Sequence, residues 1–365
     1  MKFCVDKNLF EESLSMVERA ISTRSTLPVL NNVLLDAKNN KLTLITTNLE
    51  IAIKTTIPIK LEKEGRTTIP VKLLSSYISL INSQEIEVEL KDAETIHIQT
   101  KESNTKIKGI SADEFPLIPK IEEEKSIKIP VKYFMENVAS IVFASALDEL
   151  RPVLAGVYLK ALEGKMYAVA TDSYRLVEVT KEIKDKDSFS VIIPSRAVLE
   201  LSRIIQKYND KDIQIDMAKN QAKFTCENIE LISRLIEGQY PDYRKIIPNT
   251  TETLSTVKKN DLVTAVKRAS LFARENSNSI KLNVMDDRIN IIVDTVQSGS
   301  ENASVSAKTV GGEKTIAFNA QYLIDALNNL DSENVIVGVN SSITPGVIKG
   351  ENRGDVLHVI MPLKV

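Results

Sequence analysis

The sequence predicts an α+β protein of three tandem, similar domains, each made of two halves that combine one helix with several antiparallel strands. Two observations carry this prediction: motifs recur about 125 residues apart, and the hydrophobic periodicity switches from helical to alternating after each motif. The 365 residues also exceed one ordinary core, at roughly 100–200 residues per domain. Connections are too short for repeated parallel crossovers, which favours antiparallel sheets.

A first motif ends a β-like run and opens an amphipathic helix at residues 69–74, 193–198 and 317–323. Its aligned residues Leu74 and Val198 lie 124 residues apart, and Leu323 follows after a further 125. The motif therefore marks the same point in each of three repeats.

A second helix-opening motif, at residues 6–9, 131–134 and 259–262, recurs after 125 and 128 residues. A third marker, Glu114-Phe115-Pro116, returns 125 residues later as Gln239-Tyr240-Pro241, and Ile360-Met361-Pro362 follows after another 121. We therefore expect domains at residues 1–119, 120–248 and 249–365.

The six helices are expected at residues 7–21, 72–82, 132–143, 196–208, 259–274 and 321–330. Leu201, Ile204 and Ile205 show the helical period, whereas Ile86, Val88 and Leu90 alternate as in a strand. The proline-containing, charged or Thr-rich stretches at 116–130 and 241–257 are expected to connect the domains.

The composition argues against membrane and secreted proteins. The chain is 43% hydrophobic and 26% charged, without an apolar run near 18 residues or a basic-then-apolar leader, so we expect a soluble protein. The only two cysteines, Cys4 and Cys226, are too few for a disulfide framework or a thiolate zinc site, which favours the cytoplasm.

The charge is balanced overall but sorted between elements. The formal net charge is −2, which excludes a generally basic coat for nucleic acid. The six expected helices carry 11 Lys or Arg against 7 Asp or Glu, and the remainder carries 36 against 42. Any contact with DNA must therefore come from charge sorted onto one surface, and the expected helices carry a positive excess.

The sequence holds no convincing catalytic or cofactor motif. It lacks a phosphate-binding loop, a glycine fingerprint and histidines at metal-ligand spacing. His97 is expected on the polar face of a strand, and His358 is expected to be an exposed structural residue of the same kind. Asp172 is expected to support a turn. We therefore predict a non-enzymatic protein without cofactor or metal.

Four ordered segments resemble one known family: Arg24 to Leu30 (RSTLPVL), Ala170 to Leu176 (ATDSYRL), Gly238 to Arg244 (GQYPDYR) and Val359 to Val365 (VIMPLKV). With the triplication, they resemble the bacterial β sliding clamp, the processivity subunit of DNA polymerase III. The resemblance implies the DNA-clamp fold and a head-to-tail homodimer that closes into a ring. Helices would line a hole around double-stranded DNA, and sheets would form the outer wall.

The resemblance also implies sites. Residues that match DNA-facing positions of the family are Arg24, Lys72, Lys132, Arg151 and Arg196; each alone could equally be a solvated charge. Phosphate contacts there would hold DNA without reading its sequence. Residues that match the dimer contact are Leu271 and Phe272, facing the region from Leu73 to Ile81.

A peptide-binding pocket between the second and third domains is implied as well. Its matching residues are Leu154, Thr171, Ser173, Tyr174, Arg175, Leu176, Pro241, Lys245, Ile246, Val359, Met361, Pro362, Leu363 and Lys364. Taken singly, Leu154, Leu176 and Val359 could equally belong to the core, whereas the terminal Met-Pro-Leu is expected to be exposed. Tyr174 stands where many members have His, and Lys245 and Lys364 stand for Arg, which puts the fine peptide preference in question.

The implied partners are double-stranded DNA, a second copy of the chain, the DNA polymerase III catalytic subunit and the clamp-loader ATPase. Repair polymerases, ligase and mismatch-repair proteins would carry the same binding motif, and no membrane is involved. ATP would belong to the loader. Two rival readings remain: a repeat scaffold that binds peptides without encircling DNA, and a hydrolase that uses His97 with Asp172.

Overall fold

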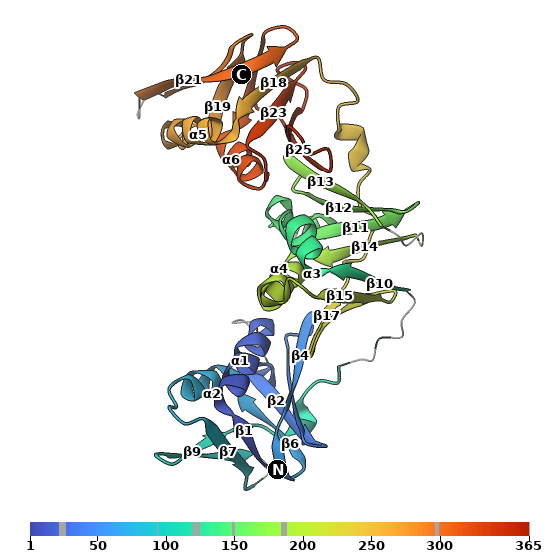
Figure 1. Ribbon diagram of the computed structural model, residues 1–365, viewed down its shortest axis with the longest axis vertical. Helices are drawn as coiled ribbons and strands as arrows, with labels where there is room; N and C mark the ends of the chain where they lie inside the picture. Colours follow the sequence, from blue (N-terminus) through green and yellow to red (C-terminus); the bar gives the residue numbers. More distant parts are fainter. Residues whose placement is uncertain are drawn as a thin grey trace. The chain divides into compact units, whose positions relative to one another are not determined.

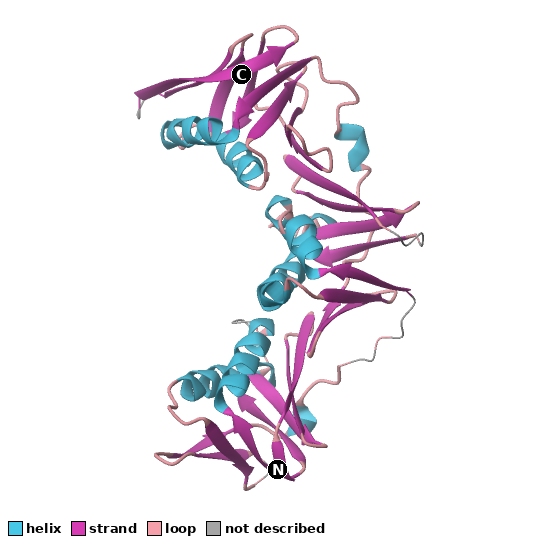
Figure 2. Ribbon diagram, in the orientation of Figure 1, coloured by secondary structure: helices cyan, strands magenta, loops and turns pink. Residues whose placement is uncertain are grey.

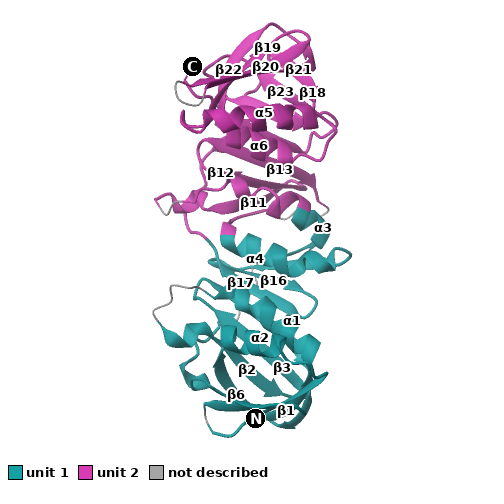
Figure 3. Cartoon of the chain, turned by 90° about the vertical axis from the view of Figure 1, so that its left-hand side faces the viewer, with its two compact units in different colours: residues 1–135, 196–235 teal, residues 136–195, 236–365 magenta. Residues whose placement is uncertain are grey.

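The computed structural model describes residues 1–21, 27–92, 94–118, 121, 125–147, 150–183, 188–295 and 299–364. The chain forms two compact units (Figure 3), which we call unit 1 (residues 1–135 and 196–235) and unit 2 (136–195 and 236–365). The central repeat contributes to both units. The division into three domains at residues 119 and 248 stays a prediction from the repeats.

Unit 1 holds two antiparallel sheets in its described residues. The first, in spatial order, is β5 (Lys60–Lys63), β1 (Lys2–Asp6), β7 (Glu85–Leu90), β8 (Thr95–Gln99) and β9 (Asn104–Lys108). The second is β10 (Lys125–Pro130), β15 (Asp212–Met217), β16 (Gln221–Cys226), β17 (Ile229–Arg234), β4 (Ile51–Pro58), β3 (Lys41–Thr47), β2 (Asn32–Lys38) and β6 (Gly65–Pro70). The pairing of β17 with β4 joins the central repeat to the first.

Four helices belong to unit 1: α1 (Lys7–Val17), α2 (Val71–Ser79), α3 (Val131–Tyr133) and α4 (Ser195–Ile205). Asp6 caps α1 by accepting a hydrogen bond from the Leu9 backbone N–H at 3.0 Å. Helix α1 packs on α2 and on β3 and β4, burying Phe10, Leu14 and Val17. Figures 1 and 2 show these helices on one face of the sheets.

Unit 2 holds one continuous antiparallel sheet of twelve strands within its described residues. Its order is β14 (Phe189–Pro194), β11 (Gly156–Leu162), β12 (Lys165–Thr171), β13 (Arg175–Glu182), β25 (Val356–Ile360), β24 (Gly346–Gly350), β23 (Asn334–Val339), β18 (Thr253–Lys258), β21 (Gly299–Val310), β20 (Arg288–Thr295), β19 (Ser279–Val284) and β22 (Lys314–Asn319). The β13–β25 pair joins the central repeat to the last, in the register Leu176 opposite Val359.

Helices α5 (Lys259–Ala273) and α6 (Ala320–Asn328) pack on each other in unit 2. Helix α5 contacts β19, β20 and β21, and it buries Leu262, Val266 and Ala269 toward the sheet. Asn319 caps α6 through bonds from the backbone N–H groups of Gln321 and Tyr322. The apolar stripe of each helix therefore covers one sheet face.

The repeated strand-to-helix junctions are confirmed. Strands β1, β6, β10, β14, β18 and β22 each end at the residue before a helix begins. Helices α1, α2, α4, α5 and α6 lie where the periodicity predicts them, with ends within a few residues. Within the described residues, no helix is both long and apolar enough to cross a membrane.

Two expectations about local structure are wrong. The segment expected as one α-helix at 132–143 instead continues from α3 into a π-helix, Phe134–Ala139, and a 3-10 turn, Val142–Ala144. The predicted connections are also too long, because Lys125–Pro130 is strand β10 and Thr253–Lys258 is strand β18. Ile127 and Ile129 point into the core from β10, so tertiary pairing with β15 outweighs the charged composition.

Candidate peptide-binding site

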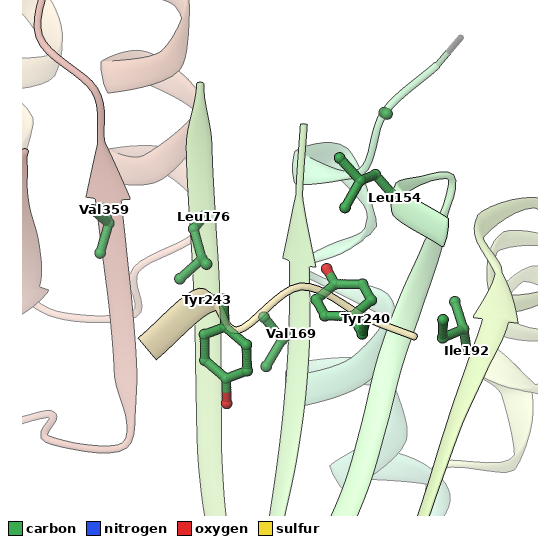
Figure 4. Packing of buried hydrophobic residues seen from close by; sticks show 8 residues of the cluster. Leu154, Val169, Leu176, Ile192, Tyr240, Tyr243 and Val359 are labelled. Atoms are coloured by element: carbon green, nitrogen blue, oxygen red, sulfur yellow. The ribbon is translucent and has the colours of Figure 1, made fainter. Parts of the chain in front are cut away.

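A cluster of buried apolar and tyrosine side chains in unit 2 gathers residues from distant parts of the chain (Figure 4). Leu154 comes from a 3-10 turn, Pro152–Leu154, Leu176 from β13 and Val359 from β25. All three are at most 5% exposed, so the core reading of these predicted pocket residues is correct for the unbound chain. We call this set the tyrosine cluster: Ala146, Leu154, Val169, Leu176, Ile192, Tyr240, Tyr243 and Val359.

The tyrosines come from the segment that crosses the sheet before β18 (Figure 4). Tyr240 stacks on Tyr158 with ring centroids 4.6 Å apart and planes at 5°, and Tyr243 meets Tyr240 edge-on at 6.4 Å. Burial raises the pKa of both Tyr240 and Tyr243 above the ordinary tyrosine range, and the Tyr243 hydroxyl donates to Glu178. These rings stay protonated and fix the crossing segment on the sheet.

The same crossing segment presents exposed residues beside the cluster. Pro241 and Lys245 are exposed, and Ile246 is exposed on a 3-10 turn, Tyr243–Ile246. Lys245 lies 3.1 Å from Asp242, a surface ion pair of small energetic weight. Apolar surface with charged residues at its rim is the usual make-up of a protein–peptide contact.

A tight loop at the start of β13 positions Tyr174. The Asp172 carboxylate accepts hydrogen bonds from the backbone N–H groups of Tyr174 and Arg175, both at 2.9 Å. Thr171 donates its hydroxyl to the Arg175 carbonyl, and Ser173 takes the left-handed conformation with φ 77°. The predicted turn-supporting role of Asp172 is confirmed, and Tyr174 projects from the loop 57% exposed.

Arg175 is directed elsewhere than the exposed residues of the site. Its guanidinium donates to Asp172 (3.0 Å), to the Phe143 carbonyl (2.7 Å) and to Asp325 of α6. It also lies over the rings of Phe143 and Tyr322, at 5.1 and 4.6 Å from their centroids. The side chain therefore ties β13 to α6 within unit 2, and a direct contact with peptide stays a prediction.

The chain's last described residues pair with the central repeat and with β22 of their own repeat. The Met361 N–H donates to the Tyr174 carbonyl at 2.9 Å, and the Leu363 N–H donates to the Ala317 carbonyl of β22 at 2.8 Å. Met361, Pro362 and Leu363 are half-buried and only Lys364 is exposed, so the expected exposure of Met-Pro-Leu is wrong. Backbone pairing at these two points explains the difference.

The predicted DNA-facing residues occupy varied surroundings. Lys72, Lys132 and Arg196 are each the second residue of their helix, α2, α3 and α4, in unit 1. Arg196 donates to the Ile21 carbonyl at 3.1 Å. Arg151, in unit 2, donates to the Asp172 carbonyl and the Ser173 hydroxyl, which places it beside the Tyr174 loop. Arg24 lies outside the described residues.

The predicted dimer residues differ in exposure. Leu73 and Leu271 are 56% and 60% exposed, whereas Ile81 is buried inside unit 1 and Phe272 is half-buried. Leu80, which the sequence reasoning did not select, is 81% exposed. Of the predicted dimer residues, Leu73 on α2 and Leu271 on α5 are therefore the exposed ones, and a dimer contact stays a prediction.

The two histidines lie only partly where the sequence reasoning placed them. His97 lies on the half-exposed face of β8, as predicted, but His358 is buried, contrary to prediction. It packs by Phe143, its Nε2 has no hydrogen-bond partner in the described chain, and burial lowers its pKa to about 3. Among the described residues, no three His, Cys, Asp or Glu side chains could hold a metal.

The sequence reasoning missed several members of the tyrosine cluster, among them Ile192, Tyr240 and Tyr243, and it also missed Tyr158 and Tyr167, which pack against the cluster. A signal was present, because the repeat marker Glu114-Phe115-Pro116 and its counterpart Gln239-Tyr240-Pro241 both carry an aromatic residue before proline. Tyr322 was also missed, although it lies three residues after Asn319, which ends β22.

Repeated units of helices and antiparallel sheet, joined by strand pairing where two repeats meet, agree with the predicted DNA-clamp fold. Three family models match the chain end to end: the DNA polymerase III beta subunit N-terminal domain at residues 1–119, its central domain at 128–242 and its C-terminal domain at 244–364. The chain therefore belongs to the DNA polymerase III beta subunit family, the beta sliding clamps. This confirms the predicted family, the DNA-clamp fold and the non-catalytic clamp function, whereas the ring-forming dimer stays a prediction.

Relatives and solved structures agree. The beta sliding clamps of Staphylococcus epidermidis and Staphylococcus aureus are 31% identical over 375 aligned residues, which cover 100% of this chain and 99% of each relative. The DNA polymerase sliding clamp of Bacillus subtilis superposes with a TM-score of 0.96 at 28% identity, covering 100% of this chain and 99% of that one. The beta chain of Streptococcus pneumoniae DNA polymerase III gives 0.96 and 28%, with full coverage of both.

Proposed function

We propose that two copies of this chain close head to tail into a ring around double-stranded DNA, and that the site beside the tyrosine cluster holds the polymerase on that ring. The observation that carries this proposal is the match of all three beta-subunit domains, in order, to one chain. The ring would slide, because contacts to phosphates hold DNA without fixing its sequence.

Helix ends support the DNA contact. Lys72, Lys132 and Arg196 each lie in the first turn of a helix. A cation there is repelled by the positive end of the helix dipole, which costs about 0.3–1 kcal/mol. Helix stability therefore does not favour these three residues. A polyanion in front of the same turns would offset the cost, which is the arrangement that a DNA-lining helix layer needs. Arg24 and Arg151 complete the proposed DNA set from the family match.

The proposed peptide site would combine exposed side chains with buried ones. Tyr174, Pro241 and Ile246 offer exposed apolar surface, while Leu154, Leu176 and Val359 lie beneath as an apolar floor. Thr171, Ser173, Arg175, Lys245, Met361, Pro362, Leu363 and Lys364 form the rest of the proposed site. Its partners would be the polymerase catalytic subunit, the clamp-loader ATPase, repair polymerases, ligase and mismatch-repair proteins.

Exposed leucines support the dimer. Leu73 and Leu80 on unit 1, and Leu271 on unit 2, are large apolar side chains exposed by more than half of their surface, which a partner chain could cover. A cavity of about 1040 Å³ on unit 1 is lined by Tyr77, Leu80 and Ile81 beside the β7 and β8 ends. We propose that the Leu271–Phe272 region of a second copy packs here, which closes a ring if the rotation permits. Cys4 and Cys226, both free thiols, suit a reducing cytoplasm.

Topological retention tests the proposal. The protein is loaded with its cognate loader and ATP onto nicked circular DNA, and the DNA is then cut. We expect the protein to stay on the circle and to leave the linear form, whereas a peptide-binding scaffold would behave identically on both. A His97→Ala variant serves as the control for the hydrolase reading and should be retained like the wild type.

A further inference from the structure

We propose that unit 1 carries a second peptide-binding site, at a cavity of about 540 Å³ lined by Leu27, Pro28, Val29, Glu94, Ile110, Glu114 and Pro116. Its occupant is a short extended segment with aliphatic side chains flanked by lysine or arginine. The inference rests on the proposed function of the site in unit 2, because the cavity borders the repeat counterparts of Leu154, Tyr240 and Pro241, which are Leu30, Phe115 and Pro116. Its volume lies in the range of 300–1,000 Å³ that is usual for ligand pockets.

The repeat copies the loop that positions Tyr174. Thr47 donates its hydroxyl to the Ile51 carbonyl, as Thr171 does to Arg175 124 residues later. Asn48 accepts from the backbone N–H groups of Glu50 and Ile51 at 3.0 and 2.8 Å, in the manner of Asp172. Leu49 takes the left-handed conformation with φ 74° and is 47% exposed. The same local geometry is thus built in both units.

The repeat also copies the apolar floor. Pro28, Val29 and Leu30 form a 3-10 turn 124 residues before Pro152, Val153 and Leu154. Ile110 pairs with Thr68 through backbone bonds, as Ile236 pairs with Ile192. Phe115 packs on Val29 and Leu30 at the position that Tyr240 holds in unit 2. Most residues that line the cavity therefore have a counterpart at or beside the tyrosine cluster.

Side-chain size explains why unit 1 has an open cavity here. Tyr158 and Tyr243 fill the space around Tyr240 in unit 2. Their counterparts by the 124- and 125-residue spacings are Leu34 and Ile118, which lack the rings. The backbone conformation is the same in both units, but the side chains at these positions are smaller in unit 1. An incoming aliphatic side chain therefore has room to pack there.

Charge selects the occupant. Glu94 and Glu114 are exposed at the cavity, and neither carboxylate has an ion-pair partner in the described part of the chain. The site in unit 2 is bordered instead by three exposed cations, Arg244, Lys245 and Lys364, with the exposed Asp242 paired to Lys245. An acidic border attracts a cationic segment and disfavours an anionic one, so the two sites should have opposite preferences for the residues that flank an apolar core.

The test uses the full chain with isotope-labelled isoleucine methyl groups and two peptides, acetyl-Lys-Leu-Val-Leu-Lys-amide and acetyl-Asp-Leu-Val-Leu-Asp-amide. In NMR spectra, the Ile110 methyl signal reports binding to unit 1 and the Ile246 methyl signal reports binding to unit 2. The Ile110→Val variant assigns the Ile110 signal. We expect the lysine peptide to shift Ile110 and the aspartate peptide to shift Ile246. A Glu94→Lys, Glu114→Lys double variant should weaken the lysine peptide about tenfold at low ionic strength.

The matched control is a double variant, Asp210→Lys with Glu227→Lys, which reverses the charge of two other exposed acidic residues of unit 1 that do not line the cavity. Its affinity for the lysine peptide should stay within twofold of the wild-type value. The inference is overturned if the lysine peptide shifts only Ile246, shifts neither signal, or binds the Glu94→Lys, Glu114→Lys variant unchanged. If the lysine peptide shifts Ile110 while the aspartate peptide leaves Ile246 unmoved, the inference holds and the proposed site in unit 2 fails. The two proposals are thus separable.

Discussion

Replacing Arg175 with glutamine should destabilise unit 2 through the loss of one tie between β13 and α6. The side chain is 14% exposed and meets carboxylates that are themselves largely covered, Asp172 at 14% and Asp325 at 24%. Removing one partner of a buried ion pair costs about 3–5 kcal/mol, because the remaining charge stays buried. The partial exposure of Asp325 reduces this, and we expect a loss of about 2–4 kcal/mol.

Calorimetry of the full chain measures the effect. For a unit of this size, about 3 kcal/mol corresponds to a fall in Tm of roughly 6–12 °C. Arg175→Lys keeps the charge but not the planar fork, so its loss should be intermediate. Arg288→Gln is the matched control in unit 2, since its pair with Asp287 is exposed on both sides and should be worth less than about 1 kcal/mol.

A double-mutant cycle with Asp325→Asn measures how much of this stability comes from the interaction between Arg175 and Asp325. We expect the two substitutions together to cost less than the sum of the single ones by about 1–3 kcal/mol, because they remove a shared interaction. If Arg175→Gln moves Tm no more than Arg288→Gln does, or if the cycle shows additivity, then the guanidinium does not join β13 to α6 in solution and the reasoning fails.

Three further outcomes are expected. Deleting residues 361–365 removes the half-buried Met361 and Leu363 and should weaken the binding of a polymerase-tail peptide by about 2–3 kcal/mol, or roughly 30- to 150-fold in affinity, as measured by fluorescence anisotropy. Light scattering should still report a dimer. An unchanged affinity would exclude the tail from the site. Leu271→Ala with Phe272→Ala should shift the protein toward monomers by about 2–4 kcal/mol per residue, and an unaltered dimer constant would mean that the contact lies elsewhere. His358 has a folded-state pKa below its unfolded value of about 6.5, so its contribution to stability is complete above that pH and is lost as the pH falls toward about 3. Between pH 7.5 and pH 5, urea unfolding should show the wild type losing about 2 kcal/mol of unfolding free energy that the His358→Leu variant retains. Equal losses in both proteins would contradict the buried neutral imidazole.

Periodicity and repeats were sufficient to predict the arrangement of elements along the chain. Each predicted helix start lies within a residue of the observed one, because the junction motif combines the end of a strand with an amphipathic run. The π-helix at Phe134–Ala139 could not be predicted, since its wider turns leave the 3.6-residue apolar pattern nearly intact. The strand at Lys125–Pro130 was hidden for a related reason: its polar positions are exposed and only pairing with β15 reveals it.

The candidate site was predicted unevenly. Alternation along β25 identifies one buried face, but both faces are covered there: Val359 packs in the tyrosine cluster and His358 packs by Phe143 on the other side. An alternation rule therefore assigns His358 to solvent, although the structure buries it. Arg175 was assigned to the peptide site by its match to the family, and its contact with peptide stays a prediction. Sequence alone could not show that its guanidinium reaches Asp325 on α6.

The long-range pairing of β13 with β25 has a consequence for how unit 2 is made. Strand β13 ends at Glu182, and its partner β25 begins only at Val356, so a ribosome that adds 5–20 residues per second leaves the β13 edge without its partner for roughly 10–35 s. During that interval a hydrophobic strand edge is open to pairing with other nascent chains. Synthesis at high polysome density should therefore favour aggregation of this protein, and chaperones that cover strand edges should raise its soluble yield.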